Sequence, residues 1–215
     1  MPNKRHQLGS ATRGISATTQ LGLNLLPVVG PVLAQSIALY ENEHRNALVD
    51  RFLADLVEQL EGIKKEKLDQ EFVIGLEFQT ATLRALEAAR VASSAQKRRL
   101  IAAALAGAAS TDRPQGLDVE AIVDTLGNLT PSDLELARLL WLEAGSGAPK
   151  AIVTPVTGPP DYADLLFHLK RLEGAGLIAD TAGTNFDYAG QYDLTPTFHR
   201  LMALLRAGGL APDGA

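Results

Sequence analysis

The 215-residue sequence contains no cysteine and only 5% aromatic residues. Without cysteine, the chain has no disulfides, no thiolate metal site and no cysteine nucleophile. Few aromatic residues, together with abundant alanine and leucine, favour helices over a packed pair of sheets. The sequence also lacks an unbroken run of the about 20 apolar residues that a membrane-spanning helix needs. The composition therefore predicts a mainly α-helical globular protein.

Acidic residues are absent from the first 40 positions, where Lys4, Arg5 and Arg13 are the only charged side chains. The net charge of −5 therefore arises from the rest of the chain. A basic start before an apolar run is typical of a secretion signal, but here the run begins late and is interrupted at Pro27 and Pro31. We expect a cytoplasmic protein whose N-terminus alone suits phosphate or anionic lipid, so association with a membrane surface stays open.

No charged residue occurs from 14 to 40, and this stretch predicts two short helices that meet at a turn near Pro27. Two interpretations remain open: a hairpin buried in a helical bundle, or an element that contacts a membrane or a partner protein. Burial is favoured, because interrupted apolar runs of this length typically mark buried helices. The candidate contact residues are Leu21, Leu25, Leu26, Val28, Val29, Val32 and Leu33.

Amphipathic patterns predict that a helical bundle occupies residues 14–110, after a flexible basic start at 1–13. The expected helices run on from the hairpin to Gly62, from about 70 to 91 and from about 94 to 109. The last of these carries Lys97, Arg98 and Arg99, which we expect on a solvated outer face. A contact with an anionic ligand is the alternative for these three cations.

A linker with one short helix is predicted for residues 111–127, because 110–116 is rich in turn-forming residues. Residues 128–207 then predict a small α+β module, and residues 208–215 a loose tail. The module begins with a helix capped by Thr130 and continues with a short strand at 151–154 and a helix over 161–173. A hairpin of 177–181 with 191–194 follows, and a helix capped by Thr195 ends the module. This order is similar to that of a winged-helix domain.

Contact between the C-terminal module and DNA would rest on Lys170 and Arg171, the only cations of the helix over 161–173. The hairpin that follows carries Asp180, Asp187 and Asp193 and no lysine or arginine. Phosphate contacts supply most of the non-specific affinity for duplex DNA. The module's charges therefore favour a protein contact over a nucleic-acid contact.

Catalytic and metal-binding patterns are not found in the sequence. His6, His44, His168 and His199 lack the spacing of a metal site, and no acids pair as general acid and base. We therefore expect no enzyme activity, no cofactor, no metal and no small-molecule substrate. Trp141, the only tryptophan, is expected to be a core anchor.

Three segments resemble the abortive-infection alpha (Abi-alpha) proteins of bacteria. They are the basic, alanine-rich helix Lys97–Leu105, the helix start Leu129–Leu134, and an ending that joins Leu169–Ile178 to Tyr192–Thr195. The resemblance implies a role in defence against phage but supplies no functional residues. Together these observations predict a non-enzymatic binding or effector protein that acts through self-association, a protein partner or membrane contact. The alternative is a winged-helix transcriptional regulator that binds duplex DNA.

Overall fold

The computed structural model describes residues 29–40, 47–92, 94–144, 152–155, 162–181 and 188–210. Its helices are α2 (Val29–Tyr40), α3 (Ala47–Gly62), α4 (Gln70–Ile74), α5 (Leu76–Val91), α6 (Ala95–Ala108), α7 (Val119–Asn128), α8 (Pro131–Ala144), α9 (Tyr162–Gly174) and α10 (Pro196–Ala207), with a 3-10 turn at Lys65–Lys67. Its strands are β1 (Ile152–Pro155), β2 (Ile178–Asp180) and β3 (Tyr188–Leu194). The prediction of a mainly helical chain with a small sheet is confirmed.

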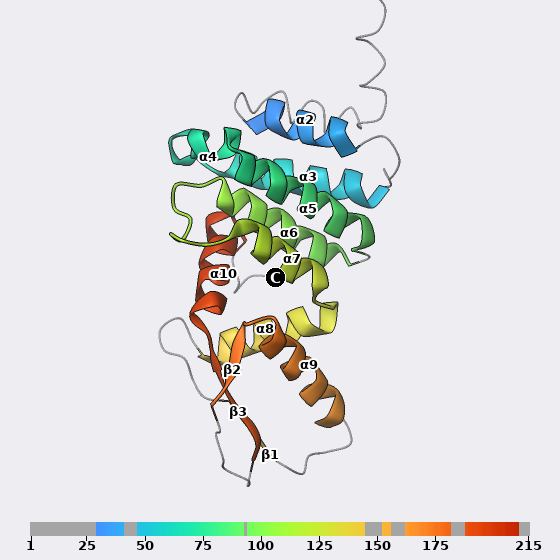
Figure 1. Ribbon diagram of the computed structural model, residues 1–215, viewed down its shortest axis with the longest axis vertical. Coiled ribbons are helices and arrows are strands. Elements are labelled where there is room, and N and C mark those ends of the chain that lie inside the picture. The colour runs from blue at the N-terminus through green and yellow to red at the C-terminus, as the bar shows by residue number, and fades with distance from the viewer. Residues whose placement is uncertain are drawn as a thin grey trace, which may run out of the picture.

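The helices stack in layers along the long axis of the molecule (Figure 1). Helix α2 lies at one end, the layer of α3, α4 and α5 comes next, and α6 and α7 follow. The buried face of α3 is broad, and its buried residues are Val49, Phe52, Leu53, Leu56, Val57 and Leu60. A face this broad packs against both α5 and α6.

The helix expected from 70 to 91 is divided in two at Gly75. Asp69 caps α4 by accepting a 3.0 Å hydrogen bond from the backbone N–H of Phe72. Gly75 has extended dihedral angles (φ −72°, ψ 158°) and then serves as the N-cap of α5. A Cβ at this position would lie 3.0 Å from the carbonyl oxygen of Phe72, a contact that glycine avoids. Apolar periodicity continues across the break, so it could not show where the helix stops.

Helix α6 is the centre of the bundle and packs against α3, α5, α7 and α10. Alanine makes these approaches possible because its side chain is small. The buried alanines of α6 are Ala102, Ala103, Ala104, Ala106 and Ala108. At Gly107 an added Cβ would overlap the carbonyl oxygen of Leu204 in α10, and at Gly208 it would overlap that of Ala103 in α6. The two backbones are therefore in direct contact.

Residues 111–127 do not act as the expected linker. They contain most of α7, which packs on α5 and α6 and buries Val119, Ile122 and Val123. Helix α10 also returns to pack on α6, so one continuous set of buried residues joins the expected bundle and module. The turn-forming residues 110–116 mark a surface turn, because a sequence pattern shows where a helix stops and not where the core is divided.

The C-terminal region contains an antiparallel sheet in the order β1-β3-β2 at the far end from α2 (Figure 1). The predicted hairpin is confirmed by the pairing of Ile178 with Leu194 and of Asp180 with Tyr192. Strand β1 pairs with the other edge of β3. Gly176 has a φ of +70° and ends the turn after α9, where the N–H of Leu177 donates to the carbonyl of Leu172.

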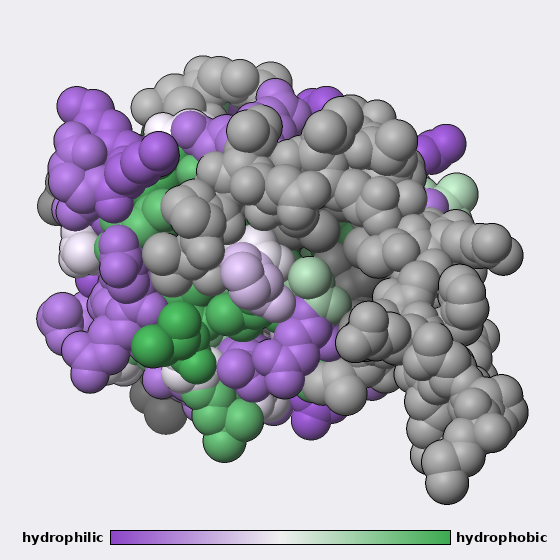
Figure 2. Space-filling model, turned by 90° about the horizontal axis from the view of Figure 1, so that it is seen from above, coloured by the Kyte–Doolittle hydropathy of each residue, from purple (hydrophilic) through white to green (hydrophobic). Residues whose placement is uncertain are grey.

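Figure 2 views the molecule from the α2 end and shows apolar surface between polar regions. Ile74 and Leu76, on either side of the break at Gly75, expose 60% and 78% of their surface. Within the described ranges, no helix has the length and apolar character required to cross a bilayer.

Candidate functional site

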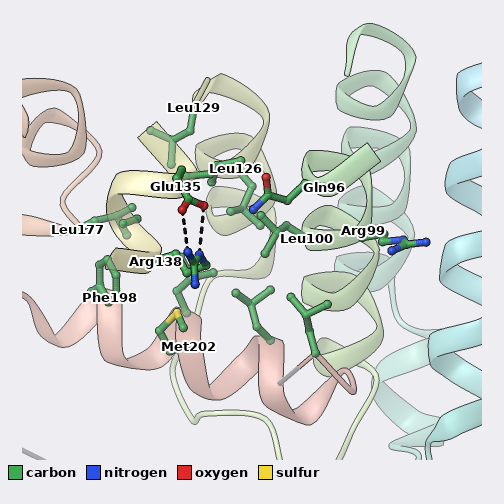
Figure 3. A pocket seen from close by; sticks show the side chains of 15 residues that line it. Gln96, Arg99, Leu100, Leu126, Leu129, Glu135, Arg138, Leu177, Phe198 and Met202 are labelled. Atoms are coloured by element: carbon green, nitrogen blue, oxygen red, sulfur yellow. Dashed lines mark hydrogen bonds and ion pairs between the residues drawn. The ribbon is translucent and has the colours of Figure 1, made fainter. Parts of the chain in front are cut away.

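A cavity of about 510 Å³ lies between α6, α7, α8 and α10 (Figure 3). Its walls are apolar and well buried. The buried lining residues are Leu126, Leu129, Leu134, Ala137, Leu177, Phe198, Leu201, Met202 and Leu205. The volume lies within the usual range of small-molecule binding sites, about 300–1,000 Å³. We refer to this cavity as the pocket.

The mouth of the pocket is polar. Glu135 and Arg138, one turn apart on α8, point toward each other in Figure 3, with Gln96 beside them. Nε and Nη2 of Arg138 donate to the two carboxylate oxygens of Glu135 over 3.1 and 2.7 Å. This hydrogen bonding lowers the pKa of Glu135 and raises that of Arg138. The pocket thus combines an apolar interior with a charge-neutral pair at its entrance.

A second cluster of polar groups joins the start of α8 to α9. The buried carboxylate of Asp133 accepts hydrogen bonds from the backbone N–H of Thr130 (2.7 Å), from Nδ1 of His168 (2.6 Å) and from Nε of Arg171 (2.8 Å). Burial by itself would raise the pKa of Asp133, but these donors outweigh burial and lower it to about 2. Asp133 is therefore an anion held by three donors from two helices.

The carboxyl end of α7 carries a set of carbonyl groups that two cations satisfy. Nζ of Lys97 donates to the carbonyls of Gly127 and Leu129 over 2.5 and 2.7 Å. Nη2 of Arg171 donates to the carbonyl between them, that of Asn128, over 2.7 Å. The last carbonyls of a helix lack partners within it and carry partial negative charge, so cations stabilise this end. Burial, and then the nearby Arg171, lower the pKa of Lys97.

The expectation that Lys97, Arg98 and Arg99 all face solvent is wrong. Arg98 is 4% exposed, and its Nη1 donates a 2.9 Å hydrogen bond to the carbonyl of Ala92, the C-cap residue of α5. Lys97 is half-buried against α7, and only Arg99, 64% exposed, meets the expectation. Successive helical residues are about 100° apart, so three in a row cannot share one face. These residues do not form a common anion site.

Lys170 and Arg171, the candidate DNA contacts, are paired with acids of the same region. Nζ of Lys170 lies 2.8 Å from Glu173 and 3.5 Å from Asp180, and the hydrogen bond to Glu173 raises the pKa of Lys170. Arg171 is engaged with Asp133, as described above. The outward part of α9 instead carries Phe167, 59% exposed, beside the guanidinium of Arg171.

The apolar N-terminal residues fall into two groups. Leu21, Leu25, Leu26 and Val28 lie outside the described residues. In contrast, α2 packs on α4 and α5 and buries its inner face, which is made of Val29, Val32 and Leu33. These three residues are core positions, as the favoured interpretation predicted, and the alternative of membrane or partner contact is wrong for them.

Trp141 is buried as predicted and stacks on Phe198, with 5.8 Å between ring centroids.

Sequence reasoning missed the pocket and the three partners of Asp133. A capping pattern around Thr130 was visible, but nothing in the sequence relates Asp133 to His168, 35 positions away. Among the described residues, no group of three histidine or acidic side chains is arranged to hold a metal ion.

Comparison with known proteins gives no match to a family model, to a curated protein or to a solved structure.

Proposed function

We propose that this chain is a non-enzymatic binding protein that associates with a second copy of itself through α9, and that it acts as an effector in defence against phage. The single observation that carries the proposal is the exposure of Phe167 on α9. Aromatic side chains dominate the energy of protein interfaces because they bury a large rigid surface. An exposed phenylalanine on α9 therefore indicates that this helix contacts a partner protein.

Further exposed apolar side chains on α8 and α9 support a protein contact. Leu139 and Leu142 on α8, and Leu165 on α9, expose 47%, 42% and 38% of their surface. The charges of α9 also support it, because Lys170 and Arg171 already have acidic partners. Binding of another protein would not need to break these ion pairs, whereas binding of phosphate would compete with them.

Self-association is tested by light scattering after size exclusion, with the full chain loaded from about 1 to 100 μM. We expect a mass above the 22.9 kDa of one chain that increases with concentration. Phe167→Ser should weaken the association at least tenfold. Leu76→Ser is the matched control, because Leu76 is equally apolar and more exposed but lies in the bundle. A single-chain mass at every concentration, or dissociation by the control alone, would contradict the proposal.

The role in phage defence follows from the resemblance to Abi-alpha proteins. It is tested by counting plaques on bacteria that produce the wild-type chain, Phe167→Ser or Leu76→Ser at equal levels. Protection by the wild type and by Leu76→Ser, with loss in Phe167→Ser, is the expected result. Equal plaque counts with and without the wild-type chain would remove this role.

One observation favours duplex DNA as a second candidate. The strand order β1-β3-β2, with α9 before the hairpin, is the order expected of a winged-helix module. A regulator of this kind would bind duplex DNA with an affinity that falls steeply between about 50 and 200 mM salt. Fluorescence anisotropy of labelled DNA measures this, and a salt-dependent complex weakened by Arg171→Gln would favour this candidate over self-association.

A further inference from the structure

We propose that the pocket binds an uncharged amphipathic molecule: a linear apolar chain that ends in a hydroxyl or primary amide group. The pocket lies between α6, α7, α8 and α10, and Phe167 does not line it. This proposal is therefore independent of the proposed self-association.

The interior of the pocket requires an apolar ligand body. Leu126 of α7 and Phe198 and Leu201 of α10 form walls that are at most 4% exposed. The charged residues that line the pocket are Arg99, Glu135 and Arg138, each of which is at least 32% exposed. A charged group placed deep inside would lose its water without gaining a partner. An alkyl chain, in contrast, gains stability for each methylene that it buries there.

The mouth of the pocket selects the head group. Both carboxylate oxygens of Glu135 already accept from Arg138, so the two charges cancel. Glu135 binds Nε and Nη2 of Arg138, so Nη1 is not used in this pair, and the carboxylate of Glu135 also has a hydrogen bond from the side chain of Gln96. A hydroxyl or primary amide can accept from Arg138 or donate to Glu135 without adding a net charge to the pair. A carboxylate would lie beside the like charge of Glu135, and an ammonium beside that of Arg138.

Trp141 provides a built-in reporter of pocket occupancy. It is the only tryptophan, and its ring stacks on Phe198, which lines the pocket. Titrations with 1-decanol, decanoate and decylammonium compare three head groups on chains of equal length. We expect a saturable change in tryptophan emission with decanol, with a Kd on the order of 10–100 μM, and a rise in Tm. The two charged probes should bind at least tenfold more weakly.

Variants that fill the pocket with a larger side chain test whether decanol binds there. Ala137→Phe and Met202→Phe place a phenyl ring in the pocket from α8 and α10, and each should weaken decanol binding at least tenfold. Ser132→Ala, an exposed position on α8 that does not line the pocket, is the control and should leave the affinity unchanged. The two substitutions lie on different helices, so one folded variant is enough for the test if the other does not fold.

Three results would overturn the proposal. Absence of a saturable emission change with decanol would show that no such ligand binds. Unchanged affinity in a folded filling variant would place the binding elsewhere on the protein. Binding of decanoate or decylammonium as tight as that of decanol would exclude a neutral head group as the preferred one.

Discussion

Asp133 and His168 are joined by a 2.6 Å hydrogen bond between Oδ1 and Nδ1, across 35 positions of sequence. The low pKa of Asp133, about 2, makes its carboxylate a pure acceptor at neutral pH, so Nδ1 of His168 carries the proton of this bond. Because Nε of Arg171 donates to the other oxygen, one buried side chain at the start of α8 holds two residues of α9. The exposed residue Phe167 directly precedes His168 on the same helix.

The first prediction concerns the charge of this cluster. Asp133→Asn removes the anion and leaves the guanidinium of Arg171 without its carboxylate partner. We expect the free energy of unfolding to fall by about 2–4 kcal/mol, as when one member of a buried pair is removed. Urea denaturation measures this. Asp164→Asn, an exposed position on α9, is the control, and equal effects of the two substitutions would contradict the prediction.

The second prediction concerns pH. The folded-state pKa of Asp133, about 2, is below its ordinary value of 3.8. The contribution of Asp133 to the free energy of unfolding is therefore complete above about pH 4 and is lost as the pH falls toward 2. The difference in unfolding free energy between wild type and Asp133→Asn should shrink by about 2 kcal/mol over this interval. Urea titrations from pH 6 to pH 2 test this, and a difference that does not depend on pH would refute it.

The third prediction separates two cations that are close in sequence. Lys97→Met removes the donor to two carbonyls at the end of α7 and should destabilise the fold by about 1–3 kcal/mol. Arg99→Met removes an exposed side chain and should cost under about 0.5 kcal/mol. Thermal and urea denaturation of both variants decide the matter. A cost for Lys97→Met no larger than that for Arg99→Met would contradict the prediction.

The fourth prediction concerns the contact between α6 and α10. Gly107→Ala and Gly208→Ala each place a methyl group against the backbone of the other segment, and each should destabilise the fold by about 2–4 kcal/mol. Gly62→Ala and Gly174→Ala are matched controls at helix ends with no atom within 4 Å of the new Cβ. The controls should be neutral or slightly stabilising. Equal melting temperatures for all four variants would show that the close approach is absent.

Local signals predicted most helices, because helix starts are written in neighbouring residues. Thr130 and Asp133 cap each other's backbone N–H groups, and Thr195 caps α10 by accepting from Phe198. The amphipathic pattern of α3 is a local signal of the same kind, since every residue that defines its buried face lies on one helix. Elements whose evidence is contained in a short segment could therefore be predicted from the sequence.

Features that depend on distant residues could not be predicted. Lys97 reads as an exposed cation until the carbonyls of α7 are placed beside it, 30 residues further on. The pocket is also hidden, because its lining residues come from four helices and each looks like an ordinary core position. The role of α7 was missed because a ten-residue helix after a turn resembles a connection until its neighbours are known.

The return of α10 to the centre of the bundle has a consequence for synthesis. Because α6 needs α10 to cover one of its faces, a chain emerging from the ribosome exposes that alanine-rich face until α10 is made. The helices made first cannot complete their core before Pro196–Ala207 has been synthesised. Chains that stop before Pro196 would therefore be substrates for chaperones or proteases rather than folded fragments.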